Sequence, residues 1–133
     1  MIKNFHHIAL AVKSIHKAKS FYSDLLGISA SNIINISEAD INIACFNVSK
    51  GFILELIEGT SEDSDISRFI EMSGEGLHHM AFEVEDIYYT IRKLKEKNIE
   101  FLNEKPQEGI DGLIVFIKPE YCNDVLIELV QKL

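Results

Sequence analysis

Two histidines and two glutamates recur at matched positions in the two halves of the chain. One copy reads FHHIALAV near the N-terminus, and the other reads LHHMAFEV near the middle. Glu55 lies 48 residues after His7 (55 − 7), and Glu128 lies 49 residues after His79 (128 − 79). Imidazoles and carboxylates together suit a divalent ion of the Mn, Fe, Co, Ni or Zn group. The repeat therefore predicts one such metal ion, held by His7, Glu55, His79 and Glu128.

The geometry of a strand selects one histidine of each pair. Side chains alternate across a strand, so His7 shares one face with alanines, whereas His6 shares the other face with bulkier apolar residues. The second copy divides in the same way. The face of small residues must line a space, and His7 and His79 point into it. We expect His6 and His78 to pack or hydrogen-bond on the side of the helices.

The two glutamates each interrupt a strand that is apolar on both sides, in ILEL and LIEL. A buried carboxylate is costly unless it is paired or bound to a metal. A single buried glutamate more often pairs with a basic residue, but the arginines, Arg68 and Arg92, both fall in predicted helices away from these strands. Four suitable residues at matched positions therefore favour the metal site.

The elements that must position these residues also repeat. Ser14 and Gly27 suit the start and end of a helix after the first strand, and Asp86 and Asn98 suit the second. Further strands are predicted over residues 29–36, 41–48 and 52–58, and over residues 99–103, 112–118 and 124–131. The fold class is therefore α+β, with two tandem βαβββ modules.

The chain is long enough for one compact domain, and it divides into three segments. Module one covers about residues 1–58, a helical connector with a cap at Ser64 covers about 59–76, and module two covers about 77–133. The connector helix places Ile66, Phe69 and Ile70 on its apolar side.

Composition excludes several kinds of partner. The net charge of −8, without a basic cluster, argues against nucleic acid, and no run reaches the roughly 18 apolar residues of a membrane span. No secretion signal stands at the start. Cys45 and Cys122 lack a metal-binding spacing, so two reduced thiols and a cytoplasmic location are expected.

With these residues, the chain resembles members of the vicinal oxygen chelate superfamily, also called the glyoxalase/bleomycin-resistance/dioxygenase family. The resemblance covers essentially the whole chain, through HIALAV from His7, ELIE from Glu55, GEGLHHMAFEVEDI from Gly74 and VLIEL from Val125. Within the superfamily the chain is most similar to methylmalonyl-CoA epimerases. The resemblance implies a curved mixed sheet around a metal-binding cavity, and it allows a homodimer.

The resemblance also implies a reaction. Metal charge beside a carbonyl would stabilise the enolate that forms when the adjacent carbon loses its proton. A carboxylate would move that proton, and Glu128, Glu55 and Asp40 are the candidates. The implied substrate is an acyl-CoA thioester, with no organic cofactor.

Two alternatives stay open at this point. One is a glyoxalase I-like lactoylglutathione lyase, which acts on a thiol adduct and shares the four-ligand scheme. The other is a protein of the same fold that sequesters a small molecule or antibiotic. The chain departs from the epimerase pattern in the loops at Gly109–Gly112 and Lys118–Asp124, which leaves the substrate open.

Overall fold

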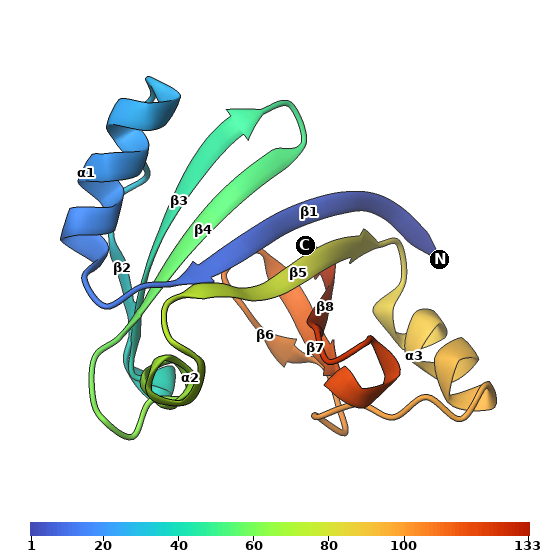
Figure 1. The fold of residues 1–133 in the computed structure, drawn as a ribbon. Coiled ribbons are helices and arrows are strands. Elements are labelled where there is room, and N and C mark those ends of the chain that lie inside the picture. The colour runs from blue at the N-terminus through green and yellow to red at the C-terminus, as the bar shows by residue number, and fades with distance from the viewer. The chain divides into compact units, whose positions relative to one another are not determined.

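The computed structural model describes residues 1–133 and divides them into two compact units (Figure 1). One unit comprises residues 8–78, and the other comprises residues 1–7 together with residues 79–133. Strands β1 (Ile2–Ala11) and β5 (Gly76–Val84) each contribute residues to both units. As a result His7 belongs to the same unit as His79, although the chain separates them by a whole module.

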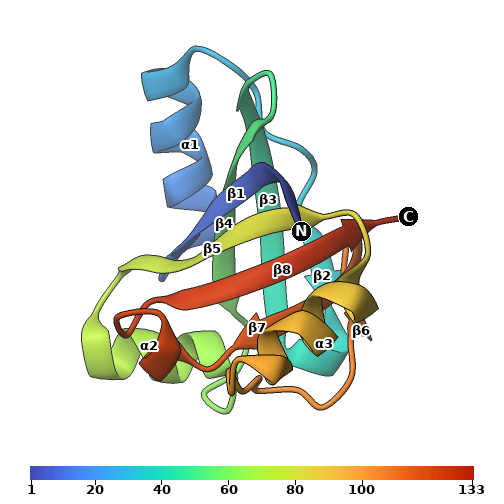
Figure 2. The ribbon, with the colours of Figure 1, turned by 90° about the vertical axis from the view of Figure 1, so that its right-hand side faces the viewer.

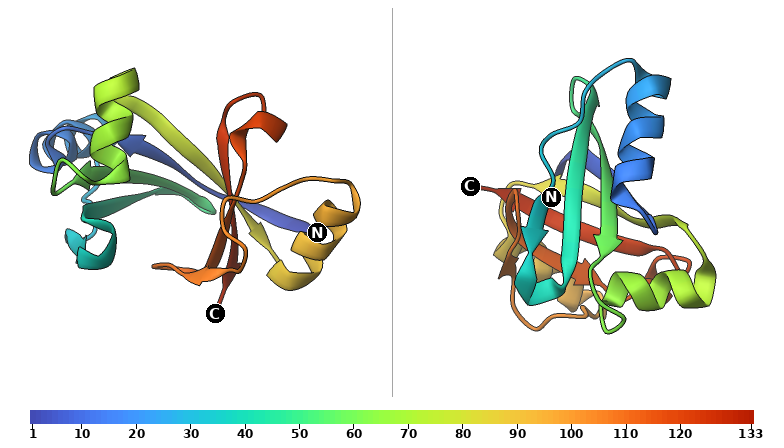
Figure 3. Two further views of the ribbon diagram at one scale, coloured as in Figure 1. Left: turned by 90° about the horizontal axis from the view of Figure 1, so that it is seen from below. Right: turned by 90° about the vertical axis from the view of Figure 1, so that its left-hand side faces the viewer.

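The unit of residues 8–78 is built on antiparallel strands in the order β2-β3-β4, with β1 beside β4. These strands are β2 (Ile34–Ile36), β3 (Ile41–Ser49) and β4 (Phe52–Gly59). Helix α1 (Ile15–Leu26) packs beside β3 and β4, helix α2 (Asp65–Ser73) follows β4, and a short helix η1 (Ser37–Ala39) joins β2 to β3 (Figure 3).

The other unit has the strand order β5-β8-β7-β6. Strand β8 (Leu126–Lys132) is parallel to β5, whereas β7 (Gly112–Ile117) and β6 (Gln107–Glu108) continue antiparallel. Helix α3 (Ile87–Glu96) packs against β8 (Figure 2), and a short helix η2 (Pro119–Tyr121) precedes β8. The α+β class and the mixed parallel and antiparallel pairing are thus confirmed.

The cores confirm the predicted strand faces. Ile8, Leu10 and Val12 pack with residues of α1 in one apolar cluster. Phe82 and Val84 pack with residues of α3 in another. The alanines of the opposite faces, Ala9, Ala11 and Ala81, are fully buried beside the histidines.

Both helices after the histidine strands begin where the sequence predicts. The Ser14 hydroxyl accepts a hydrogen bond from Lys17 N (3.3 Å), and the Asp86 carboxylate accepts one from Tyr89 N (3.0 Å). A second oxygen reaches the start of each helix from the last strand of its module. Glu58 Oε2 accepts from Ile15 N (2.9 Å), and Gln131 Oε1 accepts from Ile87 N (2.8 Å). Gly27 and Asn98 adopt the expected left-handed conformation.

Two predicted strands are wrong in extent. Only residues 34–36 of the predicted strand 29–36 are extended and paired. The predicted strand 99–103 makes a single bridge, Phe101 to Ile117, because the polar run Asn103–Pro106 follows at once and Pro106 has no N–H to donate. Pairing resumes at Gln107, as β6. None of the helices is long and apolar enough to cross a membrane.

Candidate metal centre

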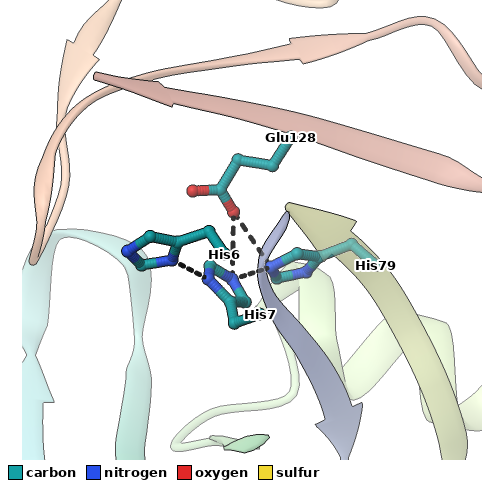
Figure 4. A network of polar contacts seen from close by, with 4 residues as sticks. All are labelled: His6, His7, His79 and Glu128. Carbon is teal, nitrogen blue, oxygen red and sulfur yellow. Dashed lines mark hydrogen bonds and ion pairs between the residues drawn. The ribbon is translucent and has the colours of Figure 1, made fainter. Parts of the chain in front are cut away.

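Three of the four predicted ligands converge in the unit of residues 1–7 and 79–133. His79 Nε2 lies 2.9 Å from Glu128 Oε2 and 3.0 Å from His7 Nε2. His7 Nε2 lies 3.6 Å from the same carboxylate oxygen. Figure 4 shows both imidazoles turned toward that oxygen from β1 and β5, with Glu128 reaching them from β8.

The pairing of β5 with β8 explains why Glu128 reaches the histidines. The parallel register places Ala81 opposite Glu128. Residues opposite one another share a sheet face, and His79 precedes Ala81 by two positions on that face. Because Ala81 carries only a methyl group, the longer Glu128 side chain can extend over it toward His79. The His79 ring also packs edge-on against Phe116, with ring centroids 5.6 Å apart.

The three side chains are almost fully buried, with 3%, 4% and 6% of His7, His79 and Glu128 exposed. Burial alone would raise the pKa of the Glu128 carboxyl, but the His7 and His79 imidazoles that face it outweigh burial and lower this pKa to about 2. The carboxylate is therefore ionised at neutral pH. A buried anion facing two ring nitrogens is the donor chemistry that a borderline divalent cation prefers.

The donor spacing also fits a single ion. Donors that bind one ion at about 2.0–2.2 Å lie roughly 3.0 Å apart in octahedral coordination and roughly 3.4 Å apart in tetrahedral coordination. The three separations of 2.9, 3.0 and 3.6 Å bracket these values. His7, His79 and Glu128 could thus hold a divalent cation with little movement.

His6 makes a contact that strand alternation does not predict. Its Nδ1 lies 2.7 Å from His7 Nδ1, and the two rings meet edge to face with centroids 5.0 Å apart. Burial and the neighbouring His7 lower the pKa of His6 below its usual range. The expectation that His6 hydrogen-bonds is met, but its partner is the adjacent histidine. Alternation describes a regular strand and cannot foresee a contact between rings of neighbouring residues.

Glu55 and Asp40, the other predicted site residues, belong to the unit of residues 8–78. Glu55 is buried in β4, directly across from Cys45 of β3. Asp40 is half-buried at the end of η1, with a left-handed backbone (φ 52°). Their participation in the site stays a prediction.

Glu83 shows what a buried carboxylate looks like when basic side chains pair with it. It lies on the same face of β5 as His79 and is 5% exposed. Its oxygens lie 3.9 Å from Lys3 Nζ and 3.5 Å from Lys132 Nζ, and both lysine side chains are 59% exposed. Glu83 is therefore an ion-pair residue whose partners reach into solvent, in contrast to Glu128 with its two buried histidines.

Related proteins match this chain along nearly its whole length. The mitochondrial methylmalonyl-CoA epimerase of Mus musculus is 33% identical over 95% of this chain and 71% of its own. The uncharacterized protein YqjC of Bacillus subtilis is 36% identical over 92% of this chain and 88% of its own. A solved structure of Streptomyces coelicolor methylmalonyl-CoA epimerase, in complex with 2-nitronate-propionyl-CoA, superimposes with a TM-score of 0.91 at 28% identity, over 99% of this chain and 96% of that one.

The similarity to epimerases in both sequence and structure makes the protein an enzyme of the isomerase class. The family model described as the Glyoxalase/Bleomycin resistance protein/Dioxygenase superfamily matches residues 6–116, a span that includes His7, Glu55 and His79. The chain therefore belongs to the glyoxalase/bleomycin resistance protein/dioxygenase superfamily.

Proposed function

We propose that this protein is a divalent-metal-dependent epimerase of methylmalonyl-CoA or a closely related acyl-CoA thioester. The observation that carries the proposal is the buried convergence of His7, His79 and Glu128, with donor separations of 2.9–3.6 Å. Similarity to methylmalonyl-CoA epimerases supports the substrate class.

His7, His79 and Glu128 would hold the ion, and Glu55 is the proposed fourth ligand. When bound, a divalent ion supplies positive charge that stabilises a carbonyl oxygen as the adjacent carbon loses its proton. Burial strengthens this effect, since charges interact more strongly where water is excluded. Two glutamates would balance the charge of the ion, which lowers the cost of burying it.

Proton transfer is assigned to carboxylates of the chain. Both contacts of Glu128 with the histidines involve Oε2, and Oε1 points aside from them (Figure 4). Glu128 could therefore hold the ion with one oxygen while the other exchanges a proton. Glu55 and Asp40 are the further candidates. A base must come within hydrogen-bond reach of the proton that it removes, so the length of the side chain decides which carboxylate can act.

Proton exchange in heavy water tests the proposal directly. The protein loaded with Co²⁺ would be incubated with methylmalonyl-CoA in D₂O, and deuterium at the α-carbon would be followed by mass spectrometry. We expect one deuterium to enter with turnover. Glu128→Gln, which keeps the size of the side chain but removes its charge, should lower the exchange rate by at least about 100-fold.

The alternatives give different results in the same assay. Consumption of a methylglyoxal–glutathione adduct without deuterium entering methylmalonyl-CoA would establish the lyase in place of the epimerase. Absence of both reactions, together with less than one divalent ion per chain after loading, would indicate a small-molecule-binding protein. Exchange that persists at the wild-type rate in metal-free protein would contradict metal dependence.

A further inference from the structure

The His6–His7 contact links the proposed metal centre to a residue outside it. His6 is 4% exposed, and its Nδ1 lies 2.7 Å from His7 Nδ1. The other nitrogen of the His7 ring, Nε2, faces His79 and Glu128. His7 therefore uses both of its ring nitrogens, one toward the proposed ion and one toward His6 (Figure 4).

The distance between the two Nδ1 atoms fits a hydrogen bond better than shared coordination of one ion. Two nitrogens bound to one ion at about 2.0–2.1 Å lie roughly 3.0–3.4 Å apart. The observed 2.7 Å is a hydrogen-bond distance. One Nδ1 must therefore carry a hydrogen, and the other must accept it.

Metal binding decides which ring donates. His7 can bind a cation only through an unprotonated Nε2, so its single proton must sit on Nδ1. His7 Nδ1–H then donates to His6 Nδ1, so the ring proton of His6 must sit on Nε2. A carboxylate oxygen of Asp111 lies within 4.8 Å of a nitrogen of each ring, which places an anion beside the pair. Each proton in this arrangement has one consistent position.

We propose that His6 is the positioning residue of His7: it accepts the Nδ1 hydrogen, fixes the tautomer and holds the ring so that the Nε2 lone pair faces His79 and Glu128. This inference rests on the proposed metal site. Partners of this kind orient a ligating histidine and raise its basicity, and their loss weakens metal affinity by about 10–100-fold.

The second copy of the motif offers a matched comparison. His78 occupies the position of His6 in the repeat, but it belongs to the unit of residues 8–78. There its ring packs edge-on against Phe69, with centroids 4.9 Å apart. The two first histidines of the pairs therefore differ in their surroundings, and substitution of His78 is a control for substitution of His6.

The experiment measures Co²⁺ affinity and the visible spectrum of bound Co²⁺ in the full chain. We expect His6→Ala and His6→Phe to bind Co²⁺ about 10–100-fold more weakly, with an altered spectrum. His6→Asn should stay within about threefold of wild type, because its Oδ1 can accept in place of Nδ1. His78→Ala should also match wild type. Thermal unfolding of the metal-free variants controls for folding.

The hydrogen bond between the two rings gives a second measurement that does not depend on affinity. In ¹⁵N NMR of the Zn²⁺-loaded protein, the His7 Nδ1–H should be hydrogen-bonded, with its proton shifted downfield, in wild type and in His6→Asn, and should lose that shift in His6→Phe.

Two results would overturn the proposal. One is a His6→Phe variant with wild-type Co²⁺ affinity and an unchanged His7 Nδ1–H resonance in the Zn²⁺-loaded protein. The other is a second Co²⁺ ion per chain that is lost in Asp111→Asn, since His6 would then be a ligand itself. Failure of the wild-type protein to bind Co²⁺ would instead remove the metal site and the proposed function together, so the two kinds of failure are distinguishable.

Discussion

The two halves of the molecule use different residues to accept hydrogen bonds from the start of the helix that follows each histidine strand. Each helix after a histidine strand receives two oxygen acceptors at its first turn, one from the residue before the helix and one from the last strand of the module. In the first half these are Ser14 and Glu58, and in the second they are Asp86 and Gln131. Each pair contains one carboxylate and one neutral side chain.

The duplication preserves the positions of these acceptors but not their charges. A helix N-terminus carries partial positive charge and unsatisfied N–H groups, so one nearby anion stabilises it. That anion lies in the cap in one half and in the strand in the other. Both halves therefore have acceptors at the same two positions, but the negative charge is at the strand position in the first half and at the cap position in the second.

The largest effect is expected when the two glutamates are removed in turn. Glu128→Ala should weaken Co²⁺ binding by at least about 100-fold while the chain stays folded, because it deletes a buried anionic donor. If the halves contribute equally, Glu55→Ala should cause a loss of similar size. Equilibrium dialysis with elemental analysis measures both, and circular dichroism controls for folding. Stoichiometric metal in Glu128→Ala would exclude this residue as a ligand.

A smaller effect is expected on stability when the strand acceptors are removed. Glu58 accepts hydrogen bonds from Ile15 N and from Asn42 Nδ2, whereas Gln131 accepts one from Ile87 N. Glu58→Ala should therefore lower the free energy of unfolding by about 2 kcal/mol, and Gln131→Ala by about 1 kcal/mol. Urea denaturation at pH 7 measures the difference. A larger loss for Gln131→Ala would show that charge at this position is unimportant.

A charge exchange in the second half tests whether one anion per helix start is sufficient. Gln131→Glu adds a second carboxylate acceptor at the start of α3, and Asp86→Ser replaces the carboxylate acceptor with a hydroxyl. Each single change should cost roughly 0.5 kcal/mol. The double variant reproduces the pattern of the first half and should lie within roughly 0.3 kcal/mol of wild type. Additive losses in the double variant would refute the correspondence.

The smallest effect concerns a surface contact of the second half. Hydrogen bonds from Tyr121 and Lys118 lower the pKa of Glu100, and the same contact raises the pKa of Tyr121 to about 12. A lowered carboxyl pKa stabilises the fold above the ordinary pKa, and this contribution is lost as pH falls through the lowered value. Tyr121→Phe should thus raise the Glu100 pKa in a ¹³C NMR titration. An unchanged Glu100 pKa would assign the shift to Lys118.

The sequence predicts the elements whose signals are local. Ser14, Gly27 and Asp86 mark helix ends through their own hydrogen-bonding or backbone preference, and the alternation around His7 identifies its face of the strand. The approach of His7, His79 and Glu128 follows from matched spacing, because a duplicated strand places equivalent residues alike.

Other features depend on contacts that sequence distance hides. The edge strand at Gln107 forms opposite Ile114, and only the three-dimensional pairing of β6 with β7 selects it over residues 99–103. The assignment of residues 1–7 to the unit of residues 79–133 likewise depends on tertiary packing, including the edge-on contact of Phe5 with Phe82 at 5.4 Å. The His6–His7 bond depends on ring orientations that no residue pattern specifies.

Because one unit combines residues 1–7 with residues 79–133, its parts are synthesised at different times. During synthesis His79 leaves the ribosome 72 residues after His7 (79 − 7), and Glu128 leaves it 121 residues after His7 (128 − 7). At translation rates of about 5–20 residues per second, the first histidine waits several seconds for its partners. Residues 8–78 can fold during this interval, whereas the unit with the proposed metal centre cannot be completed before β8 emerges. Metal binding would therefore follow folding of the unit of residues 8–78. Until β8 emerges, the growing chain lacks Glu128 and cannot form the complete metal centre.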